Sequence, residues 1–217
     1  MRLLLTAATD FELRAFAAAG SGRPVRTLLT GIGPAETAFT LTNALHRHAG
    51  SVSAVINFGI AGAFPDSGAR LLDICLAEEE VLGDLGICLP ERIERFAEQG
   101  LAVRDHFVLD AGLLSAAAQA LTQAGLHCRS GVFVTVSSSS GTTARARQIG
   151  RQRQGLCENM EGAAAARVCE AFGLPCLELR CVSNMAGERD KRRWRLREAC
   201  LRAGQAAAAV TDFLLAA

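Results

Sequence analysis

The sequence predicts an α/β fold of three layers, in which helices cover a central, largely parallel β-sheet. Short apolar runs alternate along the chain with longer segments whose apolar residues recur at helical spacing, and this alternation is typical of β–α–β units. The chain has 217 residues, of which 50% are hydrophobic and 21% charged. A chain of this size can bury a sizeable core without a disulfide or a metal. Because no composition shift or repeat divides the sequence, we expect one domain over residues 1–217.

Six apolar runs of strand length are predicted to form the sheet. In chain order they cover residues 2–8, 25–30, 53–58, 71–81, 131–136 and 175–182. The second strand ends at Gly31-Ile32-Gly33. The third, which is apolar enough to be buried, ends at a second glycine-rich turn, Gly59-Ile60-Ala61-Gly62.

Helices are predicted between these strands from helical spacing, alanine content and capping residues. They cover residues 10–19, 34–48, 110–124, 160–172 and 190–215. Thr9 or Asp10 is a suitable N-cap for the first helix, and Pro34 suits the first turn of the second. The segment before residue 124 is amphipathic, and the segment that begins at Met160 is rich in alanine.

The charge balance and the absence of long apolar segments restrict the classes of partner. Lys and Arg number 23 and Asp and Glu 22, which gives a net charge of +1. This balance excludes the overall basic field that drives nucleic-acid binding, although a small basic pocket remains possible. No apolar stretch approaches the length of a membrane span, and the N-terminus lacks the features of a signal peptide. We therefore expect a small molecule as the partner, with no nucleic acid and no membrane.

The cysteines and histidines do not indicate a metal site. The chain has 8 Cys and 4 His, without a CxxC pair or zinc-finger spacing, and it has no Tyr. Most of the cysteines lie in apolar stretches, which favours buried thiols in a reducing cytoplasm. We expect a cytoplasmic protein that uses no metal.

Two glycine turns and a serine run could bring the backbone and hydroxyl groups close to a ligand. The turns are Thr30–Pro34 and Asn57–Gly62, and neither matches a dinucleotide-binding or Walker motif, so no cofactor is expected. For each turn, the alternative is an ordinary strand-to-helix connection. The run Ser137–Ser140 is either a flexible surface loop or the lining of a polar ligand site.

Ligands of parallel α/β sheets bind beyond the carboxyl ends of the strands, and several polar residues are expected there. Glu12 is either a general base or an ordinary first-turn acid that favours the helix dipole. Glu161, with Met160 before it, can accept the two hydroxyls of a ribose diol, or it is simply an acid at a helix start. Asn184, oriented by Ser183, presents a donor and an acceptor that complement the N7/6-position edge of a purine, unless it is only a turn residue.

In this order and spacing, these features resemble the nucleoside phosphorylase/nucleosidase superfamily over nearly the whole chain. The hydrolytic branch is the most similar, namely the methylthioadenosine/S-adenosylhomocysteine nucleosidases and the futalosine hydrolases. The resemblance implies a three-layer α/β/α domain with a central twisted mixed sheet, in a homodimer or a higher homo-oligomer. It also implies that Glu12 activates the attacking water and that Met160 and Glu161 bind the ribose. The loop Asn57–Phe64 would lie beside the ribose and the nucleophile, which makes Phe58, Ala61 and Gly62 candidate binding residues.

The resemblance assigns the base to the run after residue 135 and to Asn184. Val136, Ser137 and Ser183 are the further candidates for this subsite. Asn184 stands where the adenine-specific nucleosidases carry an Asp that protonates N7. An amide can only hydrogen-bond, and it can turn to suit either purine class, but the loss of the acid favours a 6-oxopurine such as hypoxanthine.

The runs Asn57–Phe64, Thr135–Thr142 and Asn184–Asp190 are most similar to those of the futalosine hydrolases, which release hypoxanthine from futalosine in a menaquinone route. The 5′ substituent of futalosine carries a benzoate, so the resemblance implies an apolar subsite that ends at a cation. Phe58, Phe64 and Phe107 are candidates for the apolar part, and Arg104 or His106 for the cation.

Three alternatives remain open at this point. A methylthioadenosine/S-adenosylhomocysteine nucleosidase is disfavoured by Asn184. A purine nucleoside phosphorylase is disfavoured by Glu12, because two like charges about 4 Å apart cost about 4 kcal/mol at an effective dielectric of 20, which would repel phosphate. The third alternative is a non-catalytic sensor of purine nucleosides on the same fold.

Overall fold

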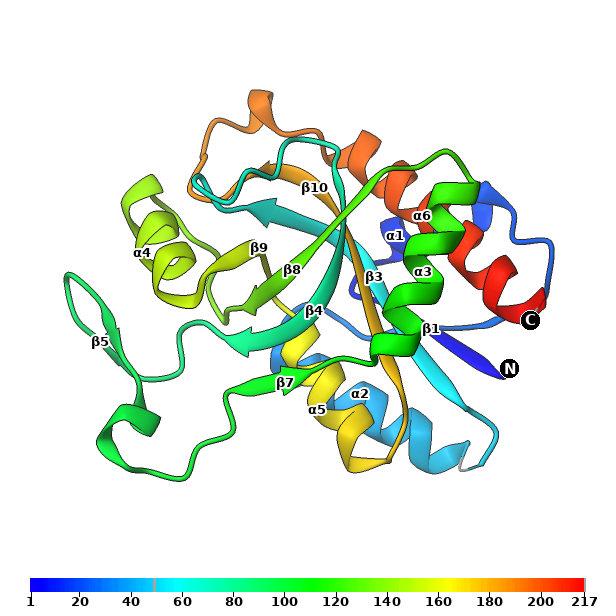
Figure 1. Cartoon of the computed structure of the whole chain (residues 1–217), viewed down its shortest axis with the longest axis horizontal. Coiled ribbons are helices and arrows are strands. Elements are labelled where there is room, and N and C mark those ends of the chain that lie inside the picture. The colour runs from blue at the N-terminus through cyan, green and yellow to red at the C-terminus, as the bar shows by residue number, and fades with distance from the viewer. Residues whose placement is uncertain (49, 217) are drawn as a thin grey trace.

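An eight-stranded mixed sheet forms the centre of the molecule in the computed structural model, which describes residues 1–48 and 50–216 (Figure 1). Its strands are β1 (Leu3–Ala7), β2 (Arg26–Leu29), β3 (Ala54–Ala63), β4 (Ile74–Leu82), β7 (His106–Val108), β8 (Cys128–Thr135), β9 (Gly155–Asn159) and β10 (Cys176–Met185). The short strands β5 (Ile87–Cys88) and β6 (Ile93–Glu94) form a separate hairpin.

The strand order shows that the sheet closes on itself. It runs β10-β4-β8-β9-β3-β1-β2, β7 pairs with β4, and β10 also pairs with β3. Strands β3, β10, β4, β8 and β9 therefore form a ring, and β1 and β2 extend from it. Three pairings are antiparallel, namely β10–β4, β3–β9 and β4–β7. The other five pairings are parallel, so the sheet is largely parallel as expected, and the three antiparallel pairings make it the mixed sheet that the family resemblance implied.

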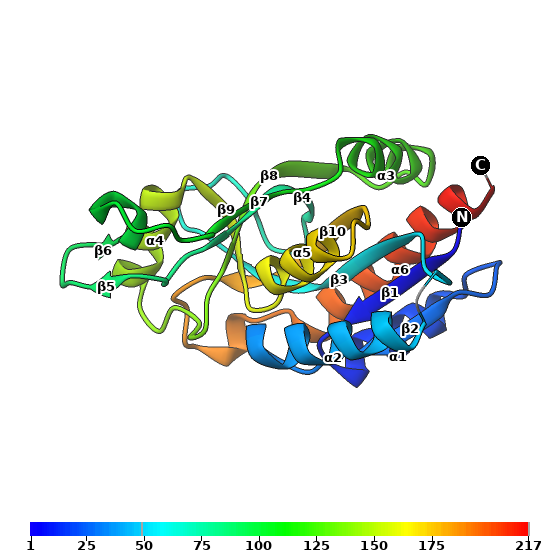
Figure 2. The ribbon, with the colours of Figure 1, turned by 90° about the horizontal axis from the view of Figure 1, so that it is seen from below.

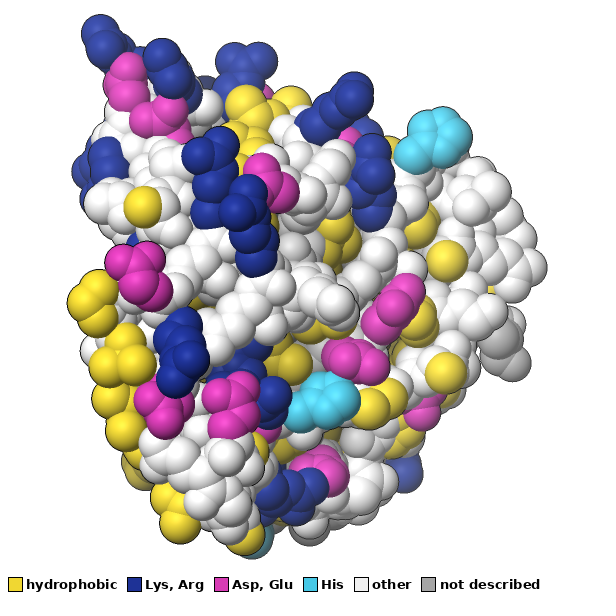
Figure 3. All heavy atoms as spheres, turned by 60° about the vertical axis from the view of Figure 1, so that its left-hand side comes forward, with side chains coloured by type: hydrophobic (Ala, Val, Ile, Leu, Met, Phe, Trp, Pro, Cys, Tyr) yellow, Lys and Arg dark blue, Asp and Glu magenta, His cyan; other side chains and the backbone are white. Residues whose placement is uncertain are grey.

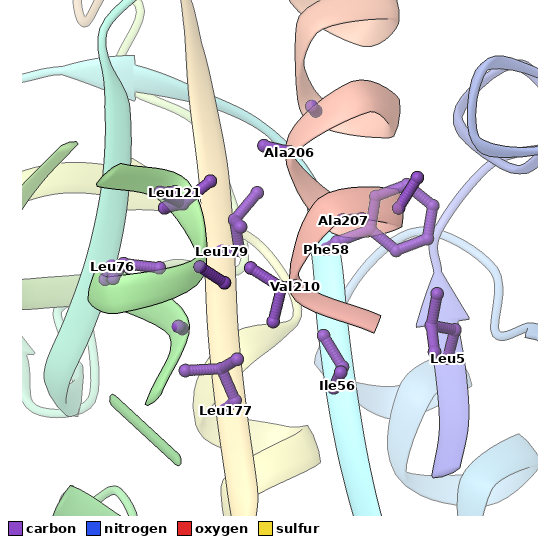
Figure 4. Close-up of a cluster of buried hydrophobic side chains, with 14 of the residues drawn as sticks. Leu5, Ile56, Phe58, Leu76, Leu121, Leu177, Leu179, Ala206, Ala207 and Val210 are labelled. Atoms are coloured by element: carbon purple, nitrogen blue, oxygen red, sulfur yellow. The ribbon is translucent and has the colours of Figure 1, made fainter. Parts of the chain in front are cut away.

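Helices cover both faces of the sheet, which confirms the predicted α/β class. They are α1 (Asp10–Ala19), α2 (Pro34–Arg47), α3 (Ala111–Gln123), α4 (Thr143–Arg153), α5 (Gly162–Ala171) and α6 (Leu196–Ala216), with short 3₁₀ helices η1 (Phe96–Gln99) and η2 (Lys191–Arg193). One apolar core joins α1, α3 and α6 to the sheet, and Figure 4 shows it around Ile56, Phe58 and Val210. A second core joins α2 and α5 to the opposite face. Figures 1 and 2 both place α4 and the β5–β6 hairpin at the end of the molecule opposite the two termini.

Several elements differ from their predicted bounds. Strand β3 continues through Gly59–Gly62, which was expected to be a turn, because β10 and β9 pair with these residues on either side. Helix α4 and strand β9 were not predicted, because α4 is rich in Arg and Gln and β9 has only 5 residues. The last helix begins at Leu196 and not at residue 190, because Asp190 caps η2 by accepting from Arg192 N–H.

The surface agrees with the even charge balance of the sequence, and most of the cysteines are buried, as their apolar surroundings in the sequence predicted. On the face shown in Figure 3, Lys and Arg side chains are interspersed with Asp and Glu. All 8 cysteines are free, and Cys75, Cys157, Cys169, Cys176 and Cys181 are buried. Within residues 1–48 and 50–216, no helix has both the length and the apolar character that a bilayer crossing requires.

Candidate active site

A cavity of about 340 Å³ opens where the carboxyl ends of β1, β3 and β10 meet the end of β9. Its wall consists of the residues that follow β1, the second half of β3, the end of β9, and the end of β10 with the loop after it. The volume falls within the range of roughly 300–1,000 Å³ that is typical of small-molecule sites. Its position at the carboxyl ends of the strands is where ligands of α/β sheets are expected to bind.

Glu12 lies at the third position of α1 and is only 2% exposed. Its Oε2 accepts hydrogen bonds from the backbone N–H and the hydroxyl of Thr9, at 2.9 and 2.7 Å, in a capping box that starts the helix. Its Oε1 accepts from the Ile60 N–H at 3.0 Å. Because an ionised carboxylate has about four acceptor positions, Oε1 keeps capacity to bind a water or a ligand in the cavity.

Gly59 leaves the space that Glu12 and Arg180 occupy. A Cβ at this position would lie 2.4 Å from Glu12 Oε1 and 2.8 Å from Arg180 Nη1. The glycine run in the sequence therefore has a packing reason, which is the close approach of two charged side chains to the backbone of β3.

Arg180 is the buried cation of the site, with 1% of its surface exposed. Its Nε donates to Glu178 Oε1 at 2.8 Å, Nη1 donates to the Ile60 carbonyl at 3.3 Å, and Nη2 lies 3.2 Å from Glu161 Oε2. Burial alone would lower the pKa of Arg180, but the negative charges of Glu178, Glu161 and Glu12 outweigh it and raise that pKa. We call Glu12, Glu161 and Arg180 the charged end of the cavity.

Glu80 and Glu178 lie behind the charged end, and neither is exposed to solvent. A Cβ on Gly162 would lie 1.9 Å from Glu80 Oε1 and 2.0 Å from Glu178 Oε2, so both carboxyl groups occupy the space that this glycine leaves. Burial, followed by the charge of Glu178, raises the pKa of Glu80 well above its usual value. Burial and the charge of Glu178 thus favour the protonated form of Glu80, while Glu178 pairs with Arg180 at 2.8 Å.

Glu161 stands at the junction of β9 and α5 and is 4% exposed. Its Oε1 accepts from the Gly33 N–H at 3.1 Å, which ties it to the first glycine turn. Asn159 Oδ1 accepts from the backbone N–H groups of Glu161 and Gly162, at 2.9 and 2.8 Å, and so shapes the turn between strand and helix. Met160 lies between these residues and lines the same cavity.

A bulge in β10 brings two consecutive side chains to the cavity. Val182 pairs with Ala61 and Asn184 pairs with Gly62, so β10 has one extra residue at Ser183. Regular alternation would send neighbouring side chains to opposite faces, whereas both Ser183 and Asn184 line the cavity.

The side-chain amide of Asn184 is held at both of its atoms. Its Oδ1 lies 2.7 Å from Ser183 Oγ, and its Nδ2 donates to the Met185 carbonyl at 3.0 Å. Across Gly62, the carboxylate of Glu158 accepts from the N–H and the hydroxyl of Ser140. We call Ser140, Glu158 and Asn184 the amide end.

Three predicted binding residues lie outside the cavity wall, which corrects their assignment. Phe58 points into the core (Figure 4), because strand alternation directs it to the face under α1 and α6. Its ring centroid is 5.7 Å from that of Phe16. Val136 is buried in the core beneath α4. Ser137 is exposed, and its N–H donates to Asp84 at 2.9 Å. Of the serine run, Ser139 and Ser140 line the cavity instead.

The side chains predicted for a 5′ subsite also lie elsewhere. Phe64 and Phe107 are buried in apolar clusters away from the cavity wall. Arg104 pairs with Glu170 on the surface, and His106 Nε2 contacts an exposed glutamate of β4 at 2.8 Å. The apolar side chain and the cation that do line the cavity near the η2 loop are Trp194 and Arg189, whose guanidinium carbon lies 5.6 Å from the Trp194 ring centroid.

Two site residues, Arg180 and Glu158, were not given their own roles from the sequence. Arg180 carried a usable signal, because it and Glu178 are two charges inside the apolar strand Cys176–Val182, and charges in a buried strand must find partners. Glu158 carried a weaker one, since its place in the short strand β9 depends on pairing with β3 and β8.

The chain matches known proteins over most of its length. Residues 9–217 match the family model described as the phosphorylase superfamily. A futalosine hydrolase of Thermus thermophilus is 39% identical over 177 residues, which are 79% of this chain and 74% of that protein. A futalosine hydrolase of Streptomyces coelicolor is 33% identical and covers 98% of this chain and 93% of its own.

A solved structure with the same fold is a 5′-methylthioadenosine/S-adenosylhomocysteine nucleosidase of Neisseria meningitidis in complex with methylthio-immucillin-A. It superposes with a TM-score of 0.82 at 19% identity, covering 98% of this chain and 99% of its own. The chain therefore belongs to the phosphorylase superfamily and, within it, to the N-glycosyl hydrolases that include the futalosine hydrolases.

Proposed function

We propose that the protein hydrolyses the N-glycosidic bond of a 6-oxopurine nucleoside, and that this nucleoside is futalosine, as a step in menaquinone biosynthesis. The observation that carries the proposal is one cavity with a buried carboxylate, Glu12, at its charged end and an amide, Asn184, at the other end. The two relatives named as futalosine hydrolases, at 39% and 33% identity, support the choice of substrate.

The ribose binds at the charged end in this proposal. Glu161 accepts the 2′- and 3′-hydroxyls, and Met160 packs against the sugar. Arg180 and the Gly33 N–H hold Glu161 in place, so its carboxylate is oriented before the substrate arrives. These contacts with the ribose align C1′ with the nucleophile.

Glu12 acts as the general base. It takes a proton from a water whose oxygen forms a bond to C1′ while the C1′–N9 bond breaks, and the electron pair of that bond leaves with the purine. The Thr9 and Ile60 contacts fix Glu12 at the cavity wall, and such general bases contribute about 10²- to 10⁴-fold in rate. The positive charge of Arg180 lies near Glu12 and interacts favourably with its carboxylate before the proton is transferred.

Water is the proposed nucleophile because the charged end is poorly suited to phosphate. The buried guanidinium of Arg180 is already shared among carboxylates, and Glu12 and Glu161 would repel an anion beside it. Phosphate sites instead present free cations and backbone N–H groups. This argument favours hydrolysis over phosphorolysis.

The purine binds at the amide end. Asn184 cannot protonate N7, so it stabilises the departing base by hydrogen bonding alone, and solvent supplies the proton that the free base gains. Charge that develops on hypoxanthine is shared with its O6, which makes it a better leaving group than adenine. Asn184 therefore fits the oxopurine better than the aminopurine.

The 5′ substituent would extend from the charged end toward the loop after β10. A second hollow of about 750 Å³ adjoins the cavity and shares Thr9, Ile60 and Leu196 with it. Its wall is mostly apolar, and Arg197 lies on it. Arg189 and Arg197 replace Arg104 and His106 as candidate partners for a substrate carboxylate.

A substrate panel tests the proposal. Base release from futalosine, inosine and methylthioadenosine is followed by chromatography with and without phosphate. We expect futalosine to be cleaved without phosphate and with a kcat/KM about 100-fold or more above that of methylthioadenosine, a ratio within the reach of purine-edge recognition and 5′ contacts together. Strict dependence on phosphate, or a preference for methylthioadenosine, would contradict it, and binding without any release would favour a sensor.

We further propose a single domain that forms a homo-oligomer in the cytoplasm. Phe11, Leu196 and Leu201 are 76%, 43% and 43% exposed around the second hollow, so an apolar surface lies beside the cavity mouth. Burying such a surface against another copy removes it from water. The free cysteines support a reducing compartment. Sedimentation analysis, and fractionation of the source cells, test these two statements.

A further inference from the structure

Glu158 is a buried carboxylate that the proposed reaction does not use. It is 6% exposed and lines the cavity at its amide end. Both of its oxygens accept from Ser140, through the backbone N–H at 2.8 Å and through the hydroxyl. Burial raises the pKa of Glu158, and the two Ser140 contacts oppose that rise. Two hydrogen bonds leave about two of the four acceptor positions of a carboxylate free.

The sheet register places Glu158 and Asn184 on either side of one glycine. Gly62 of β3 pairs with Glu158 of β9 and with Asn184 of β10. Directly paired residues on neighbouring strands point to the same face, and strands lie about 4.8 Å apart, so the two backbones are roughly 10 Å apart across the glycine. The nearest atom to a Cβ on Gly62 would be Asn184 Nδ2, at 3.4 Å. A planar base over Gly62 therefore meets an amide at one edge and a carboxylate at another.

These two groups differ in how they distinguish purines. A 6-oxopurine presents O6 as an acceptor and N1–H as a donor side by side. A 6-aminopurine presents the reverse pattern, with N6–H₂ as the donor and N1 as the acceptor. The Asn184 amide carries both an acceptor and a donor, whereas an ionised carboxylate can only accept. Asn184 favours the oxopurine only because it cannot protonate the leaving base, so a carboxylate that contacts N1 adds a discrimination that the amide does not make.

We propose that Glu158 determines base specificity by accepting a hydrogen bond from the N1–H of a 6-oxopurine and repelling the N1 lone pair of a 6-aminopurine. This inference rests on the proposed N-glycosidase function. It adds a substrate-binding role for a residue that also positions Ser140. One matched or mismatched polar contact to a base edge changes discrimination by about 10- to 100-fold.

Glu158→Gln tests the proposal, because the amide keeps the size of the side chain and adds a donor. The measurement is kcat/KM for futalosine and for its 6-amino counterpart, which differ only at the base. We expect the 6-oxo/6-amino ratio to fall about 10- to 100-fold, mainly through KM. Ser137→Ala is the control, since Ser137 belongs to the same serine run but is exposed and lies outside the cavity wall, and its ratio should stay within about threefold of wild type.

The outcomes separate this inference from the function on which it rests. A wild-type protein that cleaves neither nucleoside contradicts the proposed function. A wild-type protein that cleaves futalosine, with an E158Q ratio unchanged within twofold, overturns the role of Glu158 and leaves the function standing.

A measurement on the wild-type protein covers the case in which E158Q fails to fold. Hypoxanthine labelled with ¹⁵N at N1 is bound to the protein, and its N1–H is observed by NMR. A hydrogen bond to a carboxylate is charge-assisted and short, so we expect a downfield proton that exchanges slowly with solvent. An N1–H that keeps its free shift and exchange rate would overturn the proposal.

Discussion

At the charged end of the cavity, Glu12, Glu161 and Arg180 are held by ion pairs, a capping box and backbone N–H groups, and all three are nearly fully buried. At the amide end, Asn184 is held by one hydroxyl and one carbonyl, and Glu158 is held by a single serine. Both ends use a side chain from β10, and a second carboxylate comes from β9 itself (Glu158) or from the junction after it (Glu161), so neighbouring elements support them. They differ in how many contacts restrain each functional group.

This difference separates chemistry from specificity. Proton transfer and attack at C1′ require groups positioned to within a fraction of an ångström, and the buried network around Arg180 provides that restraint. Recognition of the base needs only a pattern of donors and acceptors, which one substitution can change without disturbing the network. We therefore expect substitutions at the charged end to lower turnover for every substrate, and substitutions at the amide end to change which substrate is preferred.

Removing the proposed base should have the largest effect. Glu12→Gln should lower kcat by about 10²- to 10⁴-fold with a small change in KM, because Gln keeps the acceptor of the capping box but cannot take a proton. Steady-state hydrolysis of futalosine measures this. Asp10→Asn is the matched control, since Asp10 is an exposed acid of the same helix turn that pairs only with Arg14. Activity of E12Q within tenfold of wild type would remove Glu12 from the role.

A pair of glycine substitutions compares the two ends directly. Gly59→Ala puts a Cβ 2.4 Å from Glu12 Oε1 and must displace that carboxylate, so kcat should fall about 100-fold for every substrate. Gly62→Ala puts a Cβ 3.4 Å from Asn184 Nδ2, on the face where the base is proposed to lie, so its effect should depend on the base and appear mainly in KM, with a loss in kcat of less than about tenfold. Melting temperatures of both variants check that they fold. Equal losses, or the reverse order, would contradict the distinction between the ends.

Asn184→Asp should change preference more than turnover. A carboxyl group at this position can protonate N7 of a 6-aminopurine, so kcat/KM for the 6-amino nucleoside should rise relative to futalosine by about tenfold. Competition between the two nucleosides in one reaction measures the ratio. Ser183→Ala, which removes the contact to Asn184 Oδ1 without adding an acid, should not produce this gain.

The smallest effect on catalysis is expected behind the charged end, where Glu80 affects stability. Burial raises the pKa of Glu80 above its usual value of about 4.5, so the folded state binds its proton more tightly than the unfolded state. The stability from that proton is present below the usual pKa and is lost as pH rises through the raised one, by about 1.4 kcal/mol for each unit of the shift. In Glu80→Gln, the side chain at this position does not titrate, so the variant lacks this pH dependence of stability.

Urea unfolding between pH 4 and pH 8 tests this sign. The stability of Glu80→Gln relative to wild type should increase with pH, while Glu91→Gln, at an exposed acid before β6, should follow the wild-type curve. A parallel pair of curves for wild type and Glu80→Gln would show that Glu80 does not carry the proton.

Much of the fold followed from local patterns in the sequence. The first two helices lie within one residue of their predicted bounds, because Thr9, Pro34 and the glycines beside them are strong boundary signals. Glu12, Glu161 and Asn184 were predicted at strand ends, and all three line one cavity. Their roles rested on the spacing of short motifs and on the family resemblance.

Other features depended on contacts between distant segments. Phe58 was expected beside the ligand, but it belongs to the continuous strand β3, which the sequence predicted to end there. A glycine run is ambiguous, because it suits a turn as well as a strand to which two charged side chains must come close. The bulge at Ser183 could not be predicted from the sequence either, since it exists only in the register between β10 and β3.

Local patterns in the sequence predicted the α/β class, the order of most elements, and the residue types of the proposed site, namely two acids and an amide. The tertiary structure brought distant charges together, because Glu80 of β4 meets Glu178 of β10, and Glu161 meets Arg180, only once the strands have paired. It also decided that Glu158 faces Asn184 across Gly62. The physical reason is that propensity and spacing are local, whereas burial of a charge is tolerated only where partners from other strands surround it.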